Sequence, residues 1–365
     1  MQFNSVLDSI QSYEAGKPIE LVVREYGIDP KDIVKLASNE NPNGASPKVV
    51  KRIAELAATA SIYPDDSFYE LKDALAAKNG VGSENIVIGS GSDQILEFAV
   101  HATLNENEAV LMNKVTFAMY EIYAKATGAK IVKTDSVHHD LAQFTALYKE
   151  HKPKLIFICT PNNPTGEAID RDELIAFLDG IDPETLVIID GAYMEYAAAK
   201  EKRFEVTARE LIERYSNVIY TGTFSKAYGL GGMRVGYGIG RADVIKVLHK
   251  LRPPFNITTL SLAAAIEALK DEAFVGACIE ENFTEMVRYE AFAEEMGLDT
   301  IPSCTNFITL MLKGHNSKEV AQTLLEQGVI IRDISSYGLN AVRITIGKKE
   351  QNSIVLEKLR MILGN

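Results

Sequence analysis

The stretch at residues 223–240 reads TFSKAYGLGGMRVGYGIG and places a lysine among small and apolar residues. Lys226 stands between a serine and an alanine, and glycines separate it from Arg234. Burial disfavours the charged form of an amine, so a lysine in such surroundings becomes available for Schiff-base chemistry. The glycines let the backbone come close to a ligand. The stretch therefore indicates a reactive amine beside a bound molecule, rather than a charge on a solvated surface.

The composition limits the kind of protein. The chain has 365 residues, of which 46% are hydrophobic and 24% charged, which is typical of globular proteins and long enough for two domains. The formal net charge of -12 argues against a nucleic-acid surface. Separated cysteines fit reduced thiols, and no Cys/His cluster indicates a metal. Because we find neither an apolar run of about 20 residues nor an export signal, we expect a cytoplasmic protein without membrane spans.

Short apolar runs alternate with longer amphipathic stretches through the middle of the chain. Most of these runs are continuously apolar, which predicts strands that are buried on both faces of a mainly parallel sheet covered by helices. The fold class is therefore α/β. The predicted strands lie at residues 84–89, 109–112, 129–134, 154–160, 185–191, 217–223 and 235–240.

The character of the sequence changes after LRPPFN at residues 251–256. A helical segment over roughly 260–295 is followed by the strand-like runs TNFITLML, VIIRD and AVRITIG, which predict a smaller α+β unit. Near the start, KLASNENPNG contains Asn, Pro and Gly residues that do not favour regular structure. We therefore expect an N-terminal arm and crossing loop at 1–45, a large domain at 46–255 and a small domain at 256–365.

Polar residues follow several of the predicted strands, where the ligands of open α/β sheets collect. SGSDQ leads directly into a helix whose free amides can bind an anion, although such a turn fits a structural role as well. PNNPTG fixes its asparagines between prolines, and Asp190 and Tyr193 follow the strand at 185–191. Together with the lysine amine, these groups match pyridoxal phosphate, whose aldehyde, pyridine nitrogen and phosphate need such partners.

The order of seven motifs matches that in fold-type I pyridoxal-phosphate aminotransferases: SNENP, YPDD, PNNPTG, DGAY, TFSKAYGLGGMRVGYGIG, IIRD and VRITIG. The sequence resembles this family over nearly its whole length, and most closely the histidinol-phosphate aminotransferases within it. The resemblance implies an aspartate aminotransferase-like fold, with a mainly parallel seven-stranded sheet in a large domain and a smaller α+β domain. It also implies pyridoxal 5'-phosphate as the cofactor and a homodimer.

The resemblance implies roles for the residues around the cofactor. Lys226 would form the Schiff base and move the proton between substrate and cofactor, and Asp190 would pair with the pyridinium nitrogen. Asn163 and Tyr193 would bond the phenolic oxygen of the ring. The resemblance also implies that the phosphate is bound by Ser92, Asp93, Ser225 and Arg234. It further implies that Phe117 contacts the face of the ring and that Tyr63 contacts the cofactor of the neighbouring subunit.

For the substrate, the resemblance implies that Arg343 binds the carboxylate of glutamate and acts with Arg332 and Tyr13 on the phosphate of histidinol phosphate. The planar donor fork of guanidinium suits both anions. Asn39 in the crossing loop is expected close by. The implied reaction moves an amino group between L-glutamate and imidazole-acetol phosphate in histidine biosynthesis. The alternatives are an aromatic amino acid or another phosphorylated ketone as substrate, or a threonine-phosphate decarboxylase.

Two positions depart from the family pattern. Gly191 stands where the family usually has Glu, and because strand side chains alternate in direction we expect little effect on the ring contact of Asp190. Residues 115–117 read VTF instead of PTY, which keeps an aromatic face. Tyr120 and Tyr123 follow Phe117 at helical spacing and are expected in the core. A transcription regulator with an aminotransferase-like sensor domain is disfavoured by the acidic charge.

Overall fold

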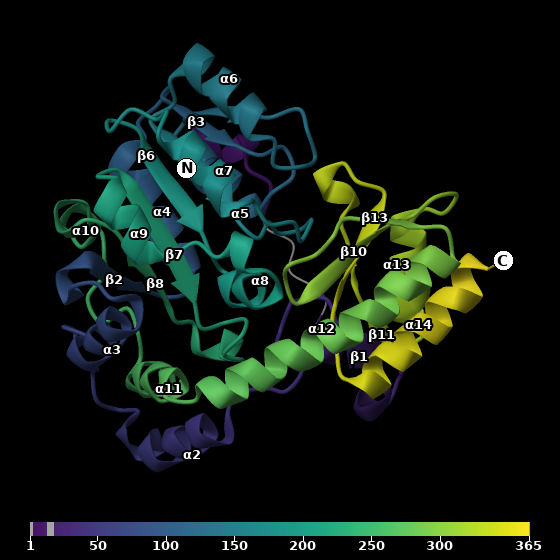
Figure 1. The fold of residues 1–365 in the computed structure, drawn as a ribbon. Helices are drawn as coiled ribbons and strands as arrows, with labels where there is room; N and C mark the ends of the chain where they lie inside the picture. Colours follow the sequence, from purple (N-terminus) through teal and green to yellow (C-terminus); the bar gives the residue numbers. More distant parts are fainter. Residues whose placement is uncertain (1–2, 13–17, 365) are drawn as a thin grey trace.

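The structure is a computed structural model that describes residues 3–12 and 18–364. Its larger part is built on a seven-stranded sheet surrounded by helices, and a smaller body with its own sheet lies beside it (Figure 1). In spatial order, the strands of the large sheet are β2 (Ile86–Gly89), β8 (Gly236–Ile239), β7 (Val218–Thr223), β6 (Leu186–Asp190), β5 (Leu155–Cys159), β3 (Ala109–Met112) and β4 (Lys130–Lys133).

The pairing of these strands confirms the predicted sheet. β8 runs antiparallel to both of its neighbours, and all other pairs are parallel. The helices of this part are α2 (Pro47–Leu56), α3 (Tyr69–Asn79), α4 (Ser92–Thr103), α5 (Ala118–Ala126), α6 (Leu141–His151), α7 (Arg171–Leu178), α8 (Met194–Lys200), α9 (Ala208–Arg214), α10 (Ala242–Leu248) and α11 (Thr259–Leu269).

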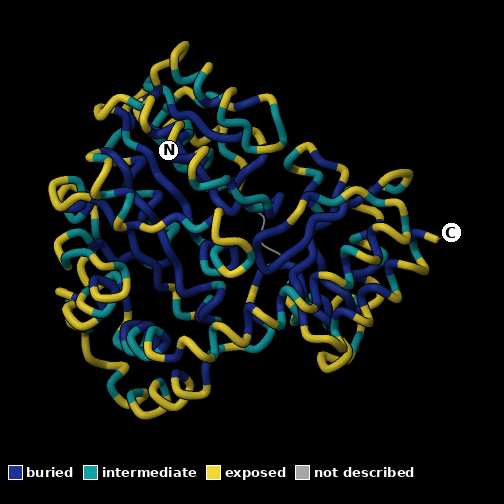
Figure 2. The backbone as a smooth tube through the Cα atoms, viewed as in Figure 1, coloured by how far each residue is buried: buried dark blue, intermediate teal, exposed yellow. Residues whose placement is uncertain are grey.

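Both faces of the large sheet carry a hydrophobic core, which explains the continuously apolar strands. Successive residues of β5 point to opposite faces. Ile156 and Ile158 join the core that includes Leu174 of α7, whereas Phe157 joins the core that includes Leu96 of α4. Every residue of β5 is buried as a result. Figure 2 shows the buried backbone concentrated along the strands of both bodies.

The smaller body contains a four-stranded antiparallel sheet in the order β12 (Arg332–Asp333), β13 (Ala341–Thr345), β10 (Phe307–Met311) and β9 (Asp299–Thr300). It shares a core with the helices α12 (Glu272–Glu295), α13 (Ser317–Glu326) and α14 (Lys349–Leu363). The N-terminal segment also packs here: β1 (Val34–Lys35) pairs in parallel with β11 (Val329–Ile330), and α1 (Ile19–Tyr26) places Val22 beside Ile330 in a small separate core.

Two predicted elements are divided in the structure. The helical segment over roughly 260–295 is broken between α11 and α12. At the break, the carboxylate of Asp271 accepts a short hydrogen bond from the Ser46 hydroxyl and forms an ion pair with Lys48, with 2.8 Å between Oδ1 and Nζ. The run VIIRD forms two short strands in different sheets, β11 and β12, because the chain crosses from one sheet to the other at Ile331. Although α11 falls within the predicted small domain, it packs against α2 and α3 of the large part. The domain division at residue 255 therefore stays a prediction.

Within residues 3–12 and 18–364, no helix combines the length and apolar character that crossing a membrane requires.

Gly236 at the start of β8 lies against the first turn of α4. A Cβ atom at this position would lie 2.0 Å from the Ser92 nitrogen, whereas a Cβ at Gly232 would meet nothing within 4 Å. Backbone atoms cannot yield to such a clash, so we expect Gly236→Ala to lower the free energy of unfolding by about 2–3 kcal/mol. The control Gly232→Ala should change it by less than about 0.5 kcal/mol. Urea unfolding followed by circular dichroism measures both, and equal stabilities would contradict this close packing.

Candidate active site

The carboxyl ends of β5, β6 and β7 open onto a cavity of about 370 Å³ that the crossing loop and the small sheet close from the other side. This cavity brings together nearly all of the side chains that the sequence singled out. They are Asn39, Ser92, Asp93, Phe117, Asn163, Asp190, Tyr193, Ser225, Lys226, Arg234, Arg332 and Arg343.

Two predicted site residues remain, Tyr13 and Tyr63. Tyr13 lies outside the described residues. Tyr63 is 78% exposed, and its ring lies 4.6 Å from the ring of Phe255, measured between centroids. Tyr63 therefore does not reach the cofactor cavity of its own chain, and its contribution to a neighbouring subunit stays a prediction.

Lys226 reaches the centre of the cavity from the loop after β7. Its Nζ donates a hydrogen bond of 3.2 Å to the Ser38 carbonyl and lies 5.8 Å from the centroid of the Tyr193 ring. Burial, assisted by the nearby Arg343 cation, lowers the pKa of the Lys226 amine to about 8. A larger fraction of the amine is therefore neutral near pH 7, which is the form that attacks a carbonyl carbon.

Asp190 places a buried carboxylate at the end of β6. One oxygen, Oδ1, accepts hydrogen bonds from the Ala192 amide at 3.2 Å and from Thr221 Oγ1 at 3.1 Å, and Oδ2 accepts from the Tyr120 hydroxyl at 2.6 Å. Burial raises the pKa of Asp190, and these three donors oppose that effect. A buried carboxylate that forms no ion pair with a described residue favours a positively charged ligand group.

Tyr120 is the contact that sequence reasoning missed. We expected this residue in the core, and its ring is indeed fully buried and stacked on Phe157, with 4.4 Å between centroids. Its hydroxyl nevertheless bonds the carboxylate of Asp190. A tyrosine rather than a phenylalanine at a fully buried helical position was the available signal, because a buried phenol needs a hydrogen-bond partner.

The start of α4 forms an anion site with Arg234. The amides of Ser92 and Asp93 belong to the first helical turn, which has no acceptors within the helix. Arg234 Nη1 donates to Ser225 Oγ at 3.3 Å, and a Cβ at Gly91 would lie 2.5 Å from Arg234 Nη2. Only glycine at position 91 lets the guanidinium lie against this turn, so a phosphate held here receives amide donors and a cation together.

The crossing loop and the small sheet meet at the opposite wall. Arg343 Nη1 donates to Asn163 Oδ1 at 2.5 Å and Arg343 Nη2 to the Ala37 carbonyl at 2.8 Å. Asn39 Nδ2 donates to the Tyr193 hydroxyl at 2.8 Å. These bonds fix an amide, a phenol and a guanidinium around the same space, which is the donor set that an oxygen-rich ligand requires.

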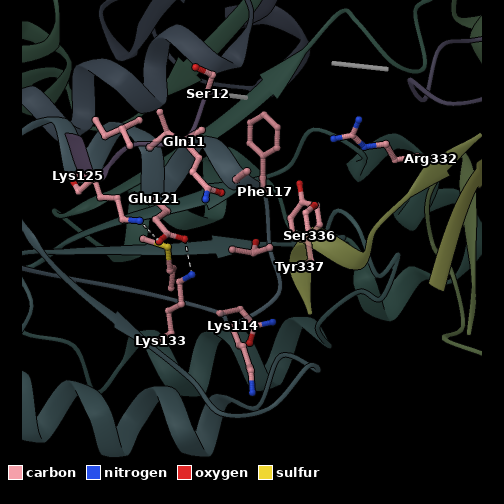
Figure 3. A pocket seen from close by; sticks show the side chains of 17 residues that line it. Gln11, Ser12, Lys114, Phe117, Glu121, Lys125, Lys133, Arg332, Ser336 and Tyr337 are labelled. Carbon is pink, nitrogen blue, oxygen red and sulfur yellow. Dashed lines mark hydrogen bonds and ion pairs between the residues drawn. The ribbon is translucent and has the colours of Figure 1, made fainter. Parts of the chain in front are cut away.

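A larger cavity of about 760 Å³ adjoins the first, and Phe117 and Arg332 line both (Figure 3). On its far wall, Glu121 pairs with Lys125 at 2.8 Å and with Lys133 at 2.5 Å. The Arg332 side chain has no hydrogen bond or ion pair with the other residues drawn in Figure 3. The arrangement gives an anionic ligand room to extend beyond Lys226 toward a second guanidinium.

The donor set fits pyridoxal phosphate. The buried carboxylate of Asp190 suits a protonated ring nitrogen, the amine of Lys226 suits an aldehyde, and the first turn of α4 with Arg234 suits a phosphate. The glycine at position 91 supports this assignment independently, because a side chain there would displace the guanidinium from the anion site.

Comparison with known proteins places these features in a wider group. Residues 31–359 match the family of class I and II aminotransferases. The chain is 58% identical to the histidinol-phosphate aminotransferase from Aliarcobacter butzleri over 366 residues, which cover 100% of both chains. It is also 58% identical to that from Wolinella succinogenes over 364 residues, which cover 100% of this chain and 99% of the relative. Its fold matches the crystal structure of histidinol-phosphate aminotransferase from Sinorhizobium meliloti in complex with pyridoxal-5'-phosphate, with a TM-score of 0.90 and 25% identity over 100% of this chain and 98% of that one.

Tyr120→Phe removes one of the three donors to Asp190 while leaving the ring stack on Phe157 intact. Because the carboxylate loses a hydrogen bond, we expect the pKa of Asp190 to rise and the affinity for pyridoxal phosphate to fall about ten-fold. Titration of the cofactor-free protein, followed by fluorescence, measures this affinity, and the pH dependence of the bound cofactor's absorbance reports the change at Asp190.

The matched control is Tyr215→Phe, which removes a 2.7 Å hydrogen bond to Asp179 on the outside of the sheet. It should leave the affinity for pyridoxal phosphate unchanged. Equal affinities and equal absorbance titrations for Tyr120→Phe and the unaltered protein would show that the hydroxyl has only a packing role.

Proposed function

The chain belongs to the class I and II aminotransferases, and on that premise we propose that it is a histidinol-phosphate aminotransferase that exchanges an amino group between L-glutamate and imidazole-acetol phosphate. The observation that carries this proposal is the identity of 58% over the whole length with relatives of that name. Its physical support is a second guanidinium, Arg332, which lines the same cavity as Arg343 and Lys226.

The cofactor of this family is pyridoxal 5'-phosphate, which supplies an electron sink for the negative charge that develops at the substrate α-carbon. Lys226 is placed to accept that carbon's proton at Nζ, because its lowered pKa favours the neutral amine. Asp190 would pair with the protonated ring nitrogen, and the hydroxyl of Tyr120 fixes the direction of its carboxylate. The first turn of α4, with Ser225 and Arg234, would hold the phosphate.

The two arginines account for two anionic substrates in one cavity. β12 and β13 pair so that Arg332 lies opposite Arg343 on neighbouring strands. Arg343 suits the α-carboxylate of glutamate, since Asn163 and the Ala37 carbonyl already fix its guanidinium plane. In the imidazole substrate a phosphorylated carbon takes the place of this carboxylate, so its phosphate suits Arg343 and Arg332 together. The role proposed for Tyr13 at this phosphate concerns a residue outside the described part of the chain.

We further propose a homodimer in which Tyr63 completes the neighbouring subunit's cofactor site. Exposed apolar side chains beside Tyr63 support this assembly, since water is an unfavourable environment for such a group of residues. They are its neighbour Ile62 and Phe255, whose ring contacts that of Tyr63. We also place the enzyme in the cytoplasm, where its buried free cysteines remain reduced.

The purified protein with pyridoxal phosphate, L-histidinol phosphate and 2-oxoglutarate should form glutamate. Lys226→Ala should lower kcat at least about a thousand-fold, because Lys226 supplies the only amine among the described residues that line the cavity. The exposed Lys250→Ala serves as a control with unchanged kcat. Coupled detection of glutamate measures both. Release of carbon dioxide from a phosphorylated amino acid without glutamate formation would instead assign a decarboxylase.

Arg332→Gln and Arg343→Gln should separate the two anion contacts. Because Arg343 serves both substrates, its loss should raise KM for glutamate and for histidinol phosphate by about 10- to 100-fold. The loss of Arg332 should raise KM for histidinol phosphate by about ten-fold or more, and KM for the unphosphorylated amino acid phenylalanine much less. Steady-state kinetics measure these values. Equal effects of Arg332→Gln on the phosphorylated and unphosphorylated substrates would contradict a phosphate contact.

A further inference from the structure

A third cavity, of about 510 Å³, lies on the opposite face of the large sheet from the carboxylate of Asp190. It is enclosed by α3, α8, α11 and the ends of β7 and β8. The alternation of strand side chains separates the two cavities: Thr221 points to Asp190, whereas its neighbour Tyr220 points to the other face. The third cavity thus stands apart from the groups that serve the aminotransferase reaction.

Two tyrosine rings lie over glycines at the floor of this cavity. A Cβ at Gly191 would lie 2.6 Å from the Tyr220 hydroxyl oxygen, and a Cβ at Gly222 would lie 2.4 Å from Cζ of Tyr237. The departure from the family pattern at Gly191 therefore has a structural consequence, because any side chain there would displace Tyr220. The absence of side chains at these two positions shapes the cavity.

The hydroxyl groups of these rings have no hydrogen-bond partner among residues 3–12 and 18–364. Tyr220 is 6% exposed and Tyr237 is 5% exposed. Both rings line the cavity, and neither hydroxyl takes part in a hydrogen bond with another described residue. Neither hydroxyl oxygen is among the buried unpartnered atoms of the described residues, so both are open to a molecule or water in the cavity.

Glu195 of α8 supplies the unbalanced charge of the cavity. The other charged side chains that line it are paired: Lys78 with Glu272 at 3.0 Å, and Lys270 with Glu267 at 3.4 Å. Glu205 likewise contacts Lys202. For Glu195, no ion pair occurs among the described residues, and its negative charge acts on the nearby hydroxyls of Tyr220, Tyr228 and Tyr237 by raising their pKa. The charge of Lys78 lowers the pKa of Glu195 in part, but Lys78 forms its ion pair with Glu272, so the cavity presents a carboxylate without a direct ion pair beside phenol oxygens.

We propose that this cavity binds a small organic cation with N–H donors, such as a guanidinium or ammonium compound, through Glu195, Tyr220 and Tyr237. The carboxylate and the phenol oxygens accept hydrogen bonds from these donors, and a charge-assisted pair with Glu195 supplies the largest interaction. The aromatic rings that form the floor suit a cation further. One carboxylate and two phenols are too few oxygen ligands for a calcium or magnesium ion.

Methylguanidinium is a suitable probe, because it carries planar N–H donors and lacks the primary amine and the carboxylate that would direct it to the cofactor cavity. Isothermal titration of the holoenzyme should give a binding heat that Glu195→Gln weakens at least about ten-fold. Tyr237→Phe should weaken it by about two- to five-fold. The exposed Glu184→Gln is the matched control and should bind like the unaltered protein. Burial raises the pKa of Glu195 to about 7, so affinity should rise between about pH 6 and about pH 8.

Three results would overturn the assignment. The first is no binding heat in the unaltered protein, and the second is equal binding by Glu195→Gln and the unaltered protein. The third is loss of binding when glutamate saturates the enzyme, because this would place the probe in the cofactor cavity. Thermal melts of each variant check that the fold is retained. Both substitutions nearly preserve side-chain shape, and Tyr237→Phe keeps the ring that covers Gly222.

Discussion

A carboxylate held inside the large sheet, with no ion pair to any described cation, is the constraint around which this enzyme is arranged. Asp190 follows the apolar residues 186–189 of β6, and among the described residues three neutral donors offset its desolvation. Such a group is stable in its charged form when a ligand brings the opposite charge. The stacked ring of Tyr120, the hydroxyl of Thr221 and the turn after β6 keep one face of the carboxylate occupied, and this leaves the other face for the cofactor.

Much of the fold and the cofactor cavity could be predicted from the sequence, because both depend on local patterns. Continuous apolar runs identify strands buried on two faces, and the residues that follow β5, β6 and β7 converge because parallel strands end at one edge. Lys226 could be recognised from its immediate neighbours alone. These features need no knowledge of contacts between distant segments.

The features that escaped prediction all depend on distant segments. The helix break at Asp271 is fixed by Lys48 and Ser46, more than two hundred residues earlier. The hydroxyl of Tyr120 finds Asp190 only once α5 has packed on the sheet, so helical spacing alone assigned it to the core. The surroundings of Gly191 could not be predicted either: we expected little effect on the ring contact of Asp190, which stays a prediction, and the sequence does not show that the ring of Tyr220 lies against Gly191 on the far face of the sheet.

The pairing of β1 with β11 has a consequence for how the chain is made. The backbone of Leu36 bonds to Ile330 and Thr345, and 306 residues separate Asn39 from its partner Thr345. At the usual pace of translation, on the order of 15–60 s passes between synthesis of the two ends of that contact. Throughout this interval the nascent crossing segment has only water or transient partners for its amides. The cofactor anchors can therefore form on the ribosome well before the groups that recognise the substrate.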